Sequence, residues 1–203
     1  MKTIALQNIT QSYDYEKYRN LVLKYAEESK TSGDQSEERV AATLINAQRI
    51  KRIDKQCIIN SELHPLVAEI KKKQRWVVIT ESWCGDGAQC IPVIAKIAQL
   101  NENIKLELVF RDEHPHLMDC FLTNGSRSIP KLVCINEETE AVIFLWGPRP
   151  RLIQNKVSEF KKDNPSIAHD ELVKNIHLWY AQDKTNAIQS EFAEIFKKIN
   201  LDE

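Results

Sequence analysis

The sequence predicts a three-layer α/β/α fold, in which helices cover both faces of a mixed central sheet and further helices extend each end of the chain. Between residues 62 and 160, helical and strand patterns follow one another in the order α-β-α-β-α-β-β-α. A β-α-β unit places two strands parallel, whereas the later β-β hairpin adds an antiparallel pair. The flanking segments show helical spacing only, and 203 residues suffice for one core with additions.

Residues 1–60 are expected to form a helical extension packed on this core. Residues 14–29 carry apolar side chains at helical spacing. Residues 36–55 resume the pattern with acidic residues early and basic residues late, as the helix dipole favours. A third helix is predicted over residues 59–73, with Pro65 in its first turn, where proline is tolerated.

Residues 61–163 are expected to form the central α/β unit. Its strands are short runs of β-branched or alternating residues bounded by turn signals, and they cover residues 75–80, 104–111, 130–135 and 141–146. Its helices cover residues 88–100, 114–125 and 148–163, and Pro92 predicts a kink in the first of them. Residues 164–203 form a second helical extension, broken at Asn164-Pro165 and near Lys184.

Composition and charge exclude several classes of protein. The chain has 28 basic and 29 acidic residues, and this near-neutral balance argues against a nucleic-acid partner or a polybasic membrane anchor. No run approaches the roughly 18 apolar residues that a membrane span requires, and the first residues lack the apolar run of a signal peptide. Five cysteines without such a signal indicate thiols in a reducing cytosol, so a cytoplasmic location is expected.

A cysteine motif stands at the junction between the first predicted strand and the helix after it. Trp83-Cys84-Gly85 opens that helix, and Pro92, Pro130 and Gly147 follow in order, with Pro130 at a distance of 46 residues from the cysteine. In this order the residues resemble the thioredoxin superfamily. With Asp86 completing Trp-Cys-Gly-Asp, they resemble more narrowly a bacterial thioredoxin-like family with helical extensions.

The resemblance implies roles for the matching residues. Cys84 takes the place of the catalytic, nucleophilic cysteine. Pro130 takes the place of the cis-proline, which leaves the Ile129 backbone facing Cys84, ready for an extended peptide or a thiol ligand. The expected substrate-binding residues are Trp83, Gly85, Asp86, Ile129, Pro130, Gly147 and Arg149.

Two positions depart from the family pattern. Gly87 replaces the resolving cysteine, so the usual two-cysteine mechanism is absent, and Val78 replaces a buried acid that assists proton transfer to that second cysteine. Cys90 does not substitute for it, because six residues along a helix rise about 9 Å, whereas the Cα atoms of a disulfide lie within about 7 Å. Cys90 is expected to be a core residue near Ile94 and Ile97.

The chemistry of Cys84 has two alternatives at this point. At a helix N-terminus, unpaired N–H groups and the helix dipole stabilise a thiolate, which is the attacking species in thiol–disulfide exchange. The neighbouring Asp86 carboxylate disfavours that second anion. Cys84 is therefore either a reactive thiol or an inert cysteine on a repurposed fold, and Trp83 beside it is a contact surface, a structural ring or both.

Cationic side chains and histidines give weaker signals. Arg149 follows the last predicted strand and is placed to donate to a thiolate or to an anionic ligand such as a glutathione carboxylate, unless it is simply solvated; Arg127 has the same alternatives. His114 and His116 with Cys120 make a poor metal site, because a proline separates the histidines and a fourth ligand is missing. Five glycines supply no phosphate-binding loop, so no cofactor is expected.

Two functional hypotheses follow. The first is a monothiol thiol-disulfide oxidoreductase, which exchanges with protein thiols and disulfides, or with a glutathione-like thiol, through Cys84. The second is a non-catalytic binding module that uses the surface around Pro130. A Cys84 pKa well below the free-thiol value of about 8.5 favours the enzyme, and a raised one favours the module. In both cases Cys84, Pro130 and Arg149 are expected to be at least partly exposed.

Overall fold

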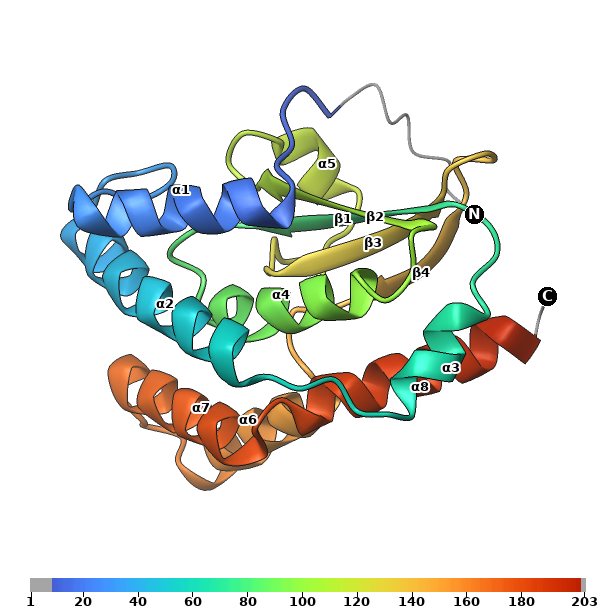
Figure 1. The fold of residues 1–203 in the computed structure, drawn as a ribbon. Helices are drawn as coiled ribbons and strands as arrows, with labels where there is room; N and C mark the ends of the chain where they lie inside the picture. The colour runs from blue at the N-terminus through green and yellow to red at the C-terminus, as the bar shows by residue number, and fades with distance from the viewer. Residues whose placement is uncertain (1–8, 202–203) are drawn as a thin grey trace.

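The computed structural model describes residues 9–201, which contain eight helices and four strands (Figure 1). The helices are α1 (Tyr15–Glu27), α2 (Glu37–Gln56), α3 (Leu63–Ala68), α4 (Gly85–Ala98), α5 (Pro115–Asp119), α6 (Arg151–Asp163), α7 (His169–Asp183) and α8 (Asn186–Leu201). The strands are β1 (Gln74–Thr80), β2 (Ile104–Phe110), β3 (Lys131–Asn136) and β4 (Val142–Trp146). The order of elements agrees with the prediction.

Two helices, α3 and α5, are much shorter than the sequence predicts. The Asn101 side chain donates to the carbonyl groups of Val67 and Ile70, at 2.7 and 2.9 Å, and these contacts accompany the early end of α3. The helix predicted over residues 114–125 stops at Asp119, and the chain then turns tightly at Asn124-Gly125, where both residues have positive φ.

The sheet is mixed, with the strand order β2-β1-β3-β4. β1 runs parallel to β2 and antiparallel to β3, and β3 pairs with β4 in an antiparallel hairpin. Residues 75–80 therefore lie in an inner strand of the sheet. Side chains of β1 alternate between the faces, so that Trp76 and Val78 enter one apolar cluster while Val77 and Ile79 enter another.

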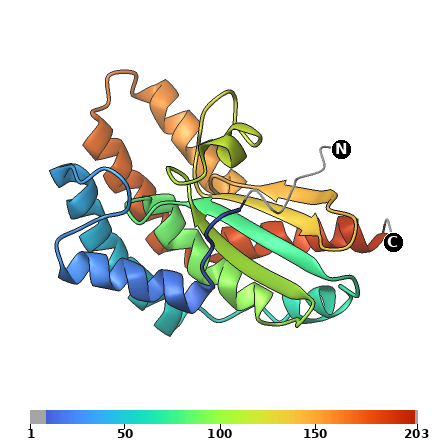
Figure 2. The same ribbon diagram turned by 90° about the horizontal axis from the view of Figure 1, so that it is seen from above.

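Helices cover both faces of this sheet, as predicted (Figures 1 and 2). The short α5 covers one face, where Leu117 and Met118 pack with Val77 and Ile79. The other face carries α4 and, beyond it, the helices of both extensions. The larger core therefore lies on the α4 side.

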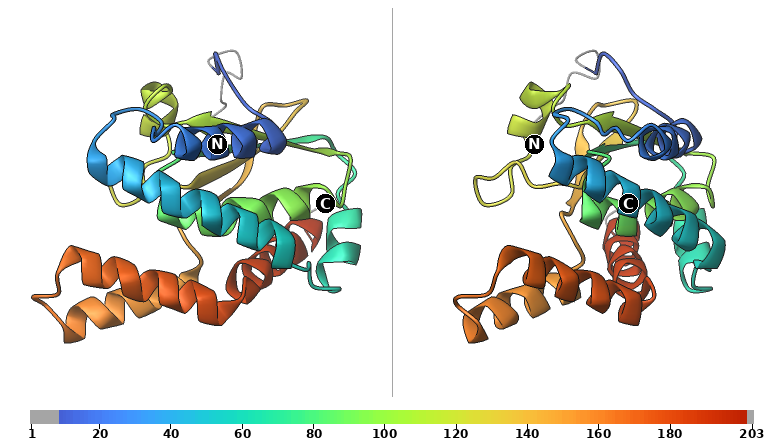
Figure 3. Two further views of the ribbon diagram at one scale, coloured as in Figure 1. Left: turned by 60° about the vertical axis from the view of Figure 1, so that its left-hand side comes forward. Right: turned by 90° about the vertical axis from the view of Figure 1, so that its left-hand side faces the viewer.

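Both extensions contribute side chains to this larger core. Tyr18 of α1 and Ile50 of α2 are fully buried in it, and Phe192 and Phe196 of α8 pack on Trp76 with ring centroids 5.7 and 6.0 Å apart. Figure 3 shows α2 and α7 on the same side of the molecule, next to the start of α4. The predicted boundaries, with a core from residue 61 to 163 between the extensions, stay a prediction.

Candidate functional site around Cys84

Cys84 caps the N-terminus of α4. Its backbone is extended, and its Sγ accepts a hydrogen bond from the Gly87 N–H at 3.3 Å. The thiol in turn donates to the Ile129 carbonyl oxygen at 3.4 Å. Cys84 therefore lies beside the Ile129–Pro130 peptide bond, which is cis, although 45 residues separate Cys84 from Ile129.

Gly147 closes against Pro130 from the end of β4. It has a φ of +110°, and a β-carbon at this position would lie 2.2 Å from the Pro130 carbonyl oxygen. No side chain fits there, so glycine is required both by the backbone conformation and by the close approach. Gly147 thus supports the segment that carries Ile129 rather than facing a ligand directly.

A buried polar network holds the turn that leads from β1 into Cys84. The Glu81 carboxylate accepts hydrogen bonds from the Ser32 hydroxyl and, at 2.8 Å, from the Asp112 N–H, and burial raises the pKa of Glu81. From α2, the Asn46 side chain donates to the Ser82 carbonyl at 3.0 Å. The N-terminal extension therefore positions Cys84, a role that the sequence analysis missed. The sequence indicated this role only through the polar residues that follow the apolar run of β1.

The Cys84 side chain is only 7% exposed, and Pro130 is buried, so the expectation that both would be partly exposed is wrong. The physical reason is that Cys84 packs with Leu117, Met118 and Ile129 in the smaller apolar cluster, while Gly147 closes against the Pro130 carbonyl oxygen. Helix α7 lies close to the start of α4, where a β-carbon on Gly85 would lie 2.7 Å from the His177 ring. Burial raises the pKa of the Cys84 thiol to about 12, the Asp86 carboxylate adds to this, and the Gly87 N–H opposes it.

Asp86 and Arg149 form a half-buried ion pair next to this thiol. Arg149 donates to Asp86 Oδ2 through Nη2 (2.6 Å) and Nε (3.1 Å), and Tyr180 donates to Asp86 Oδ1 at 2.7 Å. The sequence predicted that Arg149 donates to a thiolate or an anionic ligand. In the structure its guanidinium instead donates to the Asp86 carboxylate of the same chain. Arg127, the other arginine considered, pairs with Asp119 at the surface.

Cys90 lies in the main core, as predicted. Its side chain is fully buried with Ile94 and Ile97, and its Sγ lies 3.6 Å from the Tyr180 hydroxyl oxygen. Cys84 and Cys90 are both free cysteines.

A cleft of about 480 Å³ opens beside Cys84, between the start of α4 and the helices α2, α6 and α7. Six of the predicted site residues line it: Trp83, Cys84, Gly85, Asp86, Ile129 and Arg149. Pro130 and Gly147 do not line it, and Gly147 instead borders a neighbouring cavity. The sequence analysis missed the lining residues that the extensions supply, among them Arg49 of α2 and His177 of α7.

His177 is held neutral at the wall of this cleft. Burial lowers the pKa of His177 to about 4, and the charges of Arg49, Arg149 and Arg52 add to the effect. Its Nδ1 lies 3.3 Å from Gln89 Nε2, which is a donor, so Nδ1 accepts and Nε2 carries the proton.

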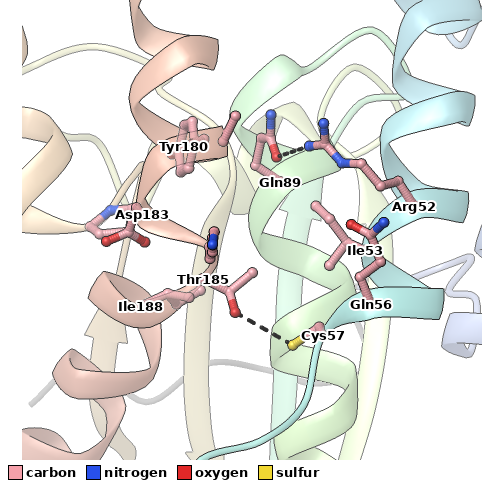
Figure 4. Close-up of a pocket in the computed structure, with 12 residues that line it drawn as sticks. Arg52, Ile53, Gln56, Cys57, Gln89, Tyr180, Asp183, Thr185 and Ile188 are labelled. Carbon is pink, nitrogen blue, oxygen red and sulfur yellow. Dashed lines mark hydrogen bonds between the residues drawn. The ribbon is translucent and has the colours of Figure 1, made fainter.

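A second cavity of about 250 Å³ lies between α2, α4 and the α7–α8 turn (Figure 4). Cys57 and Thr185 face each other across it, with Sγ and Oγ1 3.6 Å apart. Arg52 donates to Gln89 Oε1 at 3.3 Å within this cavity. Because the other end of the same amide contacts His177, Gln89 forms part of the wall between the two cavities.

In residues 9–201, no group of three or more histidine, cysteine, aspartate or glutamate side chains is arranged to hold a metal ion. Among the same residues, no helix is long and apolar enough to cross a membrane.

Comparison with known proteins agrees with this geometry. A family model described as thioredoxin matches residues 32–161. The chain belongs to the thioredoxin family. The match begins before α2 and ends in α6, so it includes the Cys84 turn and the Ile129–Pro130 segment.

Two solved structures share this thioredoxin-like fold over nearly the whole chain. A protein of unknown function from Pseudomonas aeruginosa aligns with a TM-score of 0.63 at 15% identity, covering 98% of this chain and 99% of that one. An HIV epitope-scaffold aligns with a TM-score of 0.60 at 13% identity, covering 95% and 96%. A search of curated proteins found no significant match. At these identities the solved structures support the fold, extensions included, and not an activity.

Proposed function

We propose that this protein is a thioredoxin-fold binding module, in which the cleft beside Cys84 holds a ligand while Cys84 rests as a protonated thiol. The observation that supports this most is the placement of the thiol: it is buried and donates to the Ile129 carbonyl at the edge of a cleft of about 480 Å³. That volume falls within the range of about 300–1,000 Å³ that is usual for small-molecule sites.

The electrostatics of Cys84 favour the module over the enzyme. A pKa raised to about 12 leaves almost none of the thiol ionised near pH 7, whereas exchange requires the thiolate. Gly87 stands where a resolving cysteine would be, so no second thiol follows Cys84 by three residues. The protein thus lacks both a readily formed thiolate and a resolving thiol for disulfide exchange, but it retains the cleft beside Cys84.

Monothiol oxidoreductase activity is the second candidate, and one contact favours it. The Gly87 N–H donates to Cys84 Sγ at 3.3 Å at the start of α4, which stabilises negative charge on sulfur. In this mechanism the Cys84 thiolate attacks one sulfur of a protein or glutathione mixed disulfide, a new disulfide forms to Cys84, and the other sulfur leaves as a thiolate that takes up a proton. A second, external thiolate such as that of glutathione then attacks the partner sulfur of this disulfide, forms a new disulfide with the partner and frees Cys84, which takes up a proton.

A turnover assay distinguishes the two candidates. The purified protein and its Cys84→Ser variant are incubated with the mixed disulfide of glutathione and 2-mercaptoethanol in the presence of excess reduced glutathione. We expect equal rates for the two proteins. A rate that depends on Cys84 would overturn the module and establish the oxidoreductase.

Binding is measured separately with a neutral apolar dye, N-phenyl-1-naphthylamine, whose fluorescence rises in an apolar site. Ala42 of α2 lines the cleft, so Ala42→Phe fills part of it. We expect saturable binding to the natural protein and weaker binding to the Ala42→Phe variant, with similar thermal unfolding for both. Absence of binding, or equal binding to both proteins, would count against the proposal.

A further inference from the structure

Arg49 brings a positive charge into the Cys84 cleft without a carboxylate to match it. Its guanidinium donates to the Asn46 side chain at 2.8 Å, and among residues 9–201 it forms no ion pair. Burial and the nearby Arg52 charge lower the pKa of Arg49 to about 10, although the Asp86 carboxylate opposes this, so Arg49 still carries its proton near pH 7. A partly buried cation with only an amide for a partner is a costly arrangement that a bound anion would relieve.

The guanidinium of Arg49 lies over the start of α4. A β-carbon on Gly85 would stand 3.6 Å from Arg49 Nη1 and 2.8 Å from His177 Nε2, so these two nitrogens approach the same point. Since His177 Nδ1 accepts from Gln89, Nε2–H is a donor. The helix N-terminus adds a favourable field for negative charge at this point.

The other charges of the cleft do not cancel Arg49. Asp86 is matched by Arg149, with which it forms two hydrogen bonds. Arg39 lies 4.5 Å from the Trp83 ring centroid and within 4 Å of two carboxylates outside the cleft, those of Asp34 and Asp112. Lys161 adds a further positive charge to the lining, and Glu38 is the one carboxylate left to oppose it among the described lining residues.

The rest of the cleft is apolar. Ile45 lines it with 50% of its surface exposed, which is unusual for isoleucine and leaves an apolar face open to a ligand. Across the cleft stand Val157 of α6 and Leu172 and Ile176 of α7. The lining therefore combines an apolar wall with a cationic end.

We infer that the cleft binds a small organic anion, whose oxyanion head lies between Arg49 and His177 Nε2–H and whose apolar body packs against Ile45, Leu172 and Ile176. This inference rests on the proposed binding function and names its ligand class. Arg49 and His177 come from the two extensions, so the ligand site requires both. Carboxylate, sulfonate and phosphate heads share the chemistry that the two donors recognise.

The test compares two dyes of nearly the same shape. One is the anionic 8-anilinonaphthalene-1-sulfonate, and the other is its neutral counterpart N-phenyl-1-naphthylamine. Both are titrated by fluorescence at physiological salt against the natural protein, Arg49→Gln, Arg49→Lys and Lys51→Gln. Lys51 is the matched control, because it lies two residues further along α2, carries the same charge, is exposed and does not line the cleft.

The inference predicts that Arg49→Gln weakens binding of the anionic dye by at least about tenfold. Arg49→Lys recovers part of that loss, Lys51→Gln changes anionic-dye binding by less than about twofold, and none of the three changes binding of the neutral dye. Equal loss in Arg49→Gln and Lys51→Gln, or no loss in Arg49→Gln, would overturn the anion site. If the neutral dye binds as tightly as the anionic dye, the anion site is also overturned, but the proposed binding function is still supported. Failure of both dyes to bind overturns both proposals.

Discussion

Gly87 lies so close to Thr80 that a β-carbon at position 87 would stand 2.7 Å from the Thr80 hydroxyl oxygen. The absence of a resolving cysteine at position 87 is therefore related to the packing between α4 and β1. The space that a second cysteine would need is taken by a side chain at the end of β1. The loss of the two-cysteine mechanism is therefore part of the packing of the site, and a single substitution at position 87 does not restore it.

Gly87→Ala is accordingly expected to destabilise the fold, although alanine is normally the better helix former by about 1 kcal/mol. The new β-carbon meets the Thr80 hydroxyl, and overpacking of this kind costs about 1–3 kcal/mol. Thr80→Ala in the same chain removes the contact. Urea unfolding of the two single variants and the double variant measures the coupling. A Gly87→Ala protein as stable as the natural one would contradict the account.

Gly147→Ala is expected to be the most damaging glycine substitution. Its β-carbon would meet the Pro130 carbonyl oxygen at 2.2 Å, and its φ is +110°, so strain and collision add to more than about 3 kcal/mol. Gly125→Ala is the matched control, because Gly125 also has positive φ, +76°, but its β-carbon would meet nothing within 4 Å. It is expected to cost only about 1–2 kcal/mol. Equal losses in thermal or urea unfolding would show that the Pro130 contact is unimportant.

The Asp86–Arg149 pair is expected to tune the Cys84 thiol in two opposite directions. Asp86→Asn lowers the pKa of Cys84, because it removes a neighbouring negative charge and frees Arg149 to face the sulfur. Arg149→Met raises that pKa further, because it removes the positive charge that opposes the rise. Thiolate absorbance near 240 nm, corrected with Cys84→Ser in each background, gives both shifts. Shifts of the same sign would contradict this assignment.

His177 is expected to limit stability in acid. Its pKa falls from 6.5 to about 4 in the folded protein, so the unfolded chain binds the proton first. The stability that the neutral ring contributes is complete above pH 6.5 and is lost as the pH falls through about 4, in an amount on the order of 3 kcal/mol. His177→Gln should therefore lose less unfolding free energy than the natural protein between pH 7 and pH 4.5. An identical loss would show that His177 titrates normally.

The fold was predictable from the sequence because its signals are local. A short β-branched run predicts the inner strand β1, and helical spacing in the chain ends predicts extensions with apolar faces that must be buried. The order of Cys84, Pro130 and Gly147 carried the resemblance to thioredoxins. The positions of Cys90 in the core and of residues 75–80 inside the sheet followed from geometry and composition.

The properties of the site were less predictable, because they depend on pairs far apart in the chain. Arg149 meets Asp86 across 63 residues, Tyr180 meets it across 94, and His177 reaches Gln89 across 88. No sequence pattern showed that Cys84 would be buried among Leu117, Met118 and Ile129. The sequence analysis left open whether the pKa of the thiol is lowered or raised, and this burial raises it.

The central claim is therefore tested most directly by the pKa of Cys84 itself. The pH dependence of thiolate absorbance and of alkylation by iodoacetamide is measured for the natural protein and for Cys84→Ser, and the difference isolates Cys84 from the other four cysteines. The account predicts that Cys84 contributes no thiolate below about pH 9, above the free-thiol value of about 8.5. A Cys84 pKa below that value would contradict the binding module and favour the monothiol oxidoreductase.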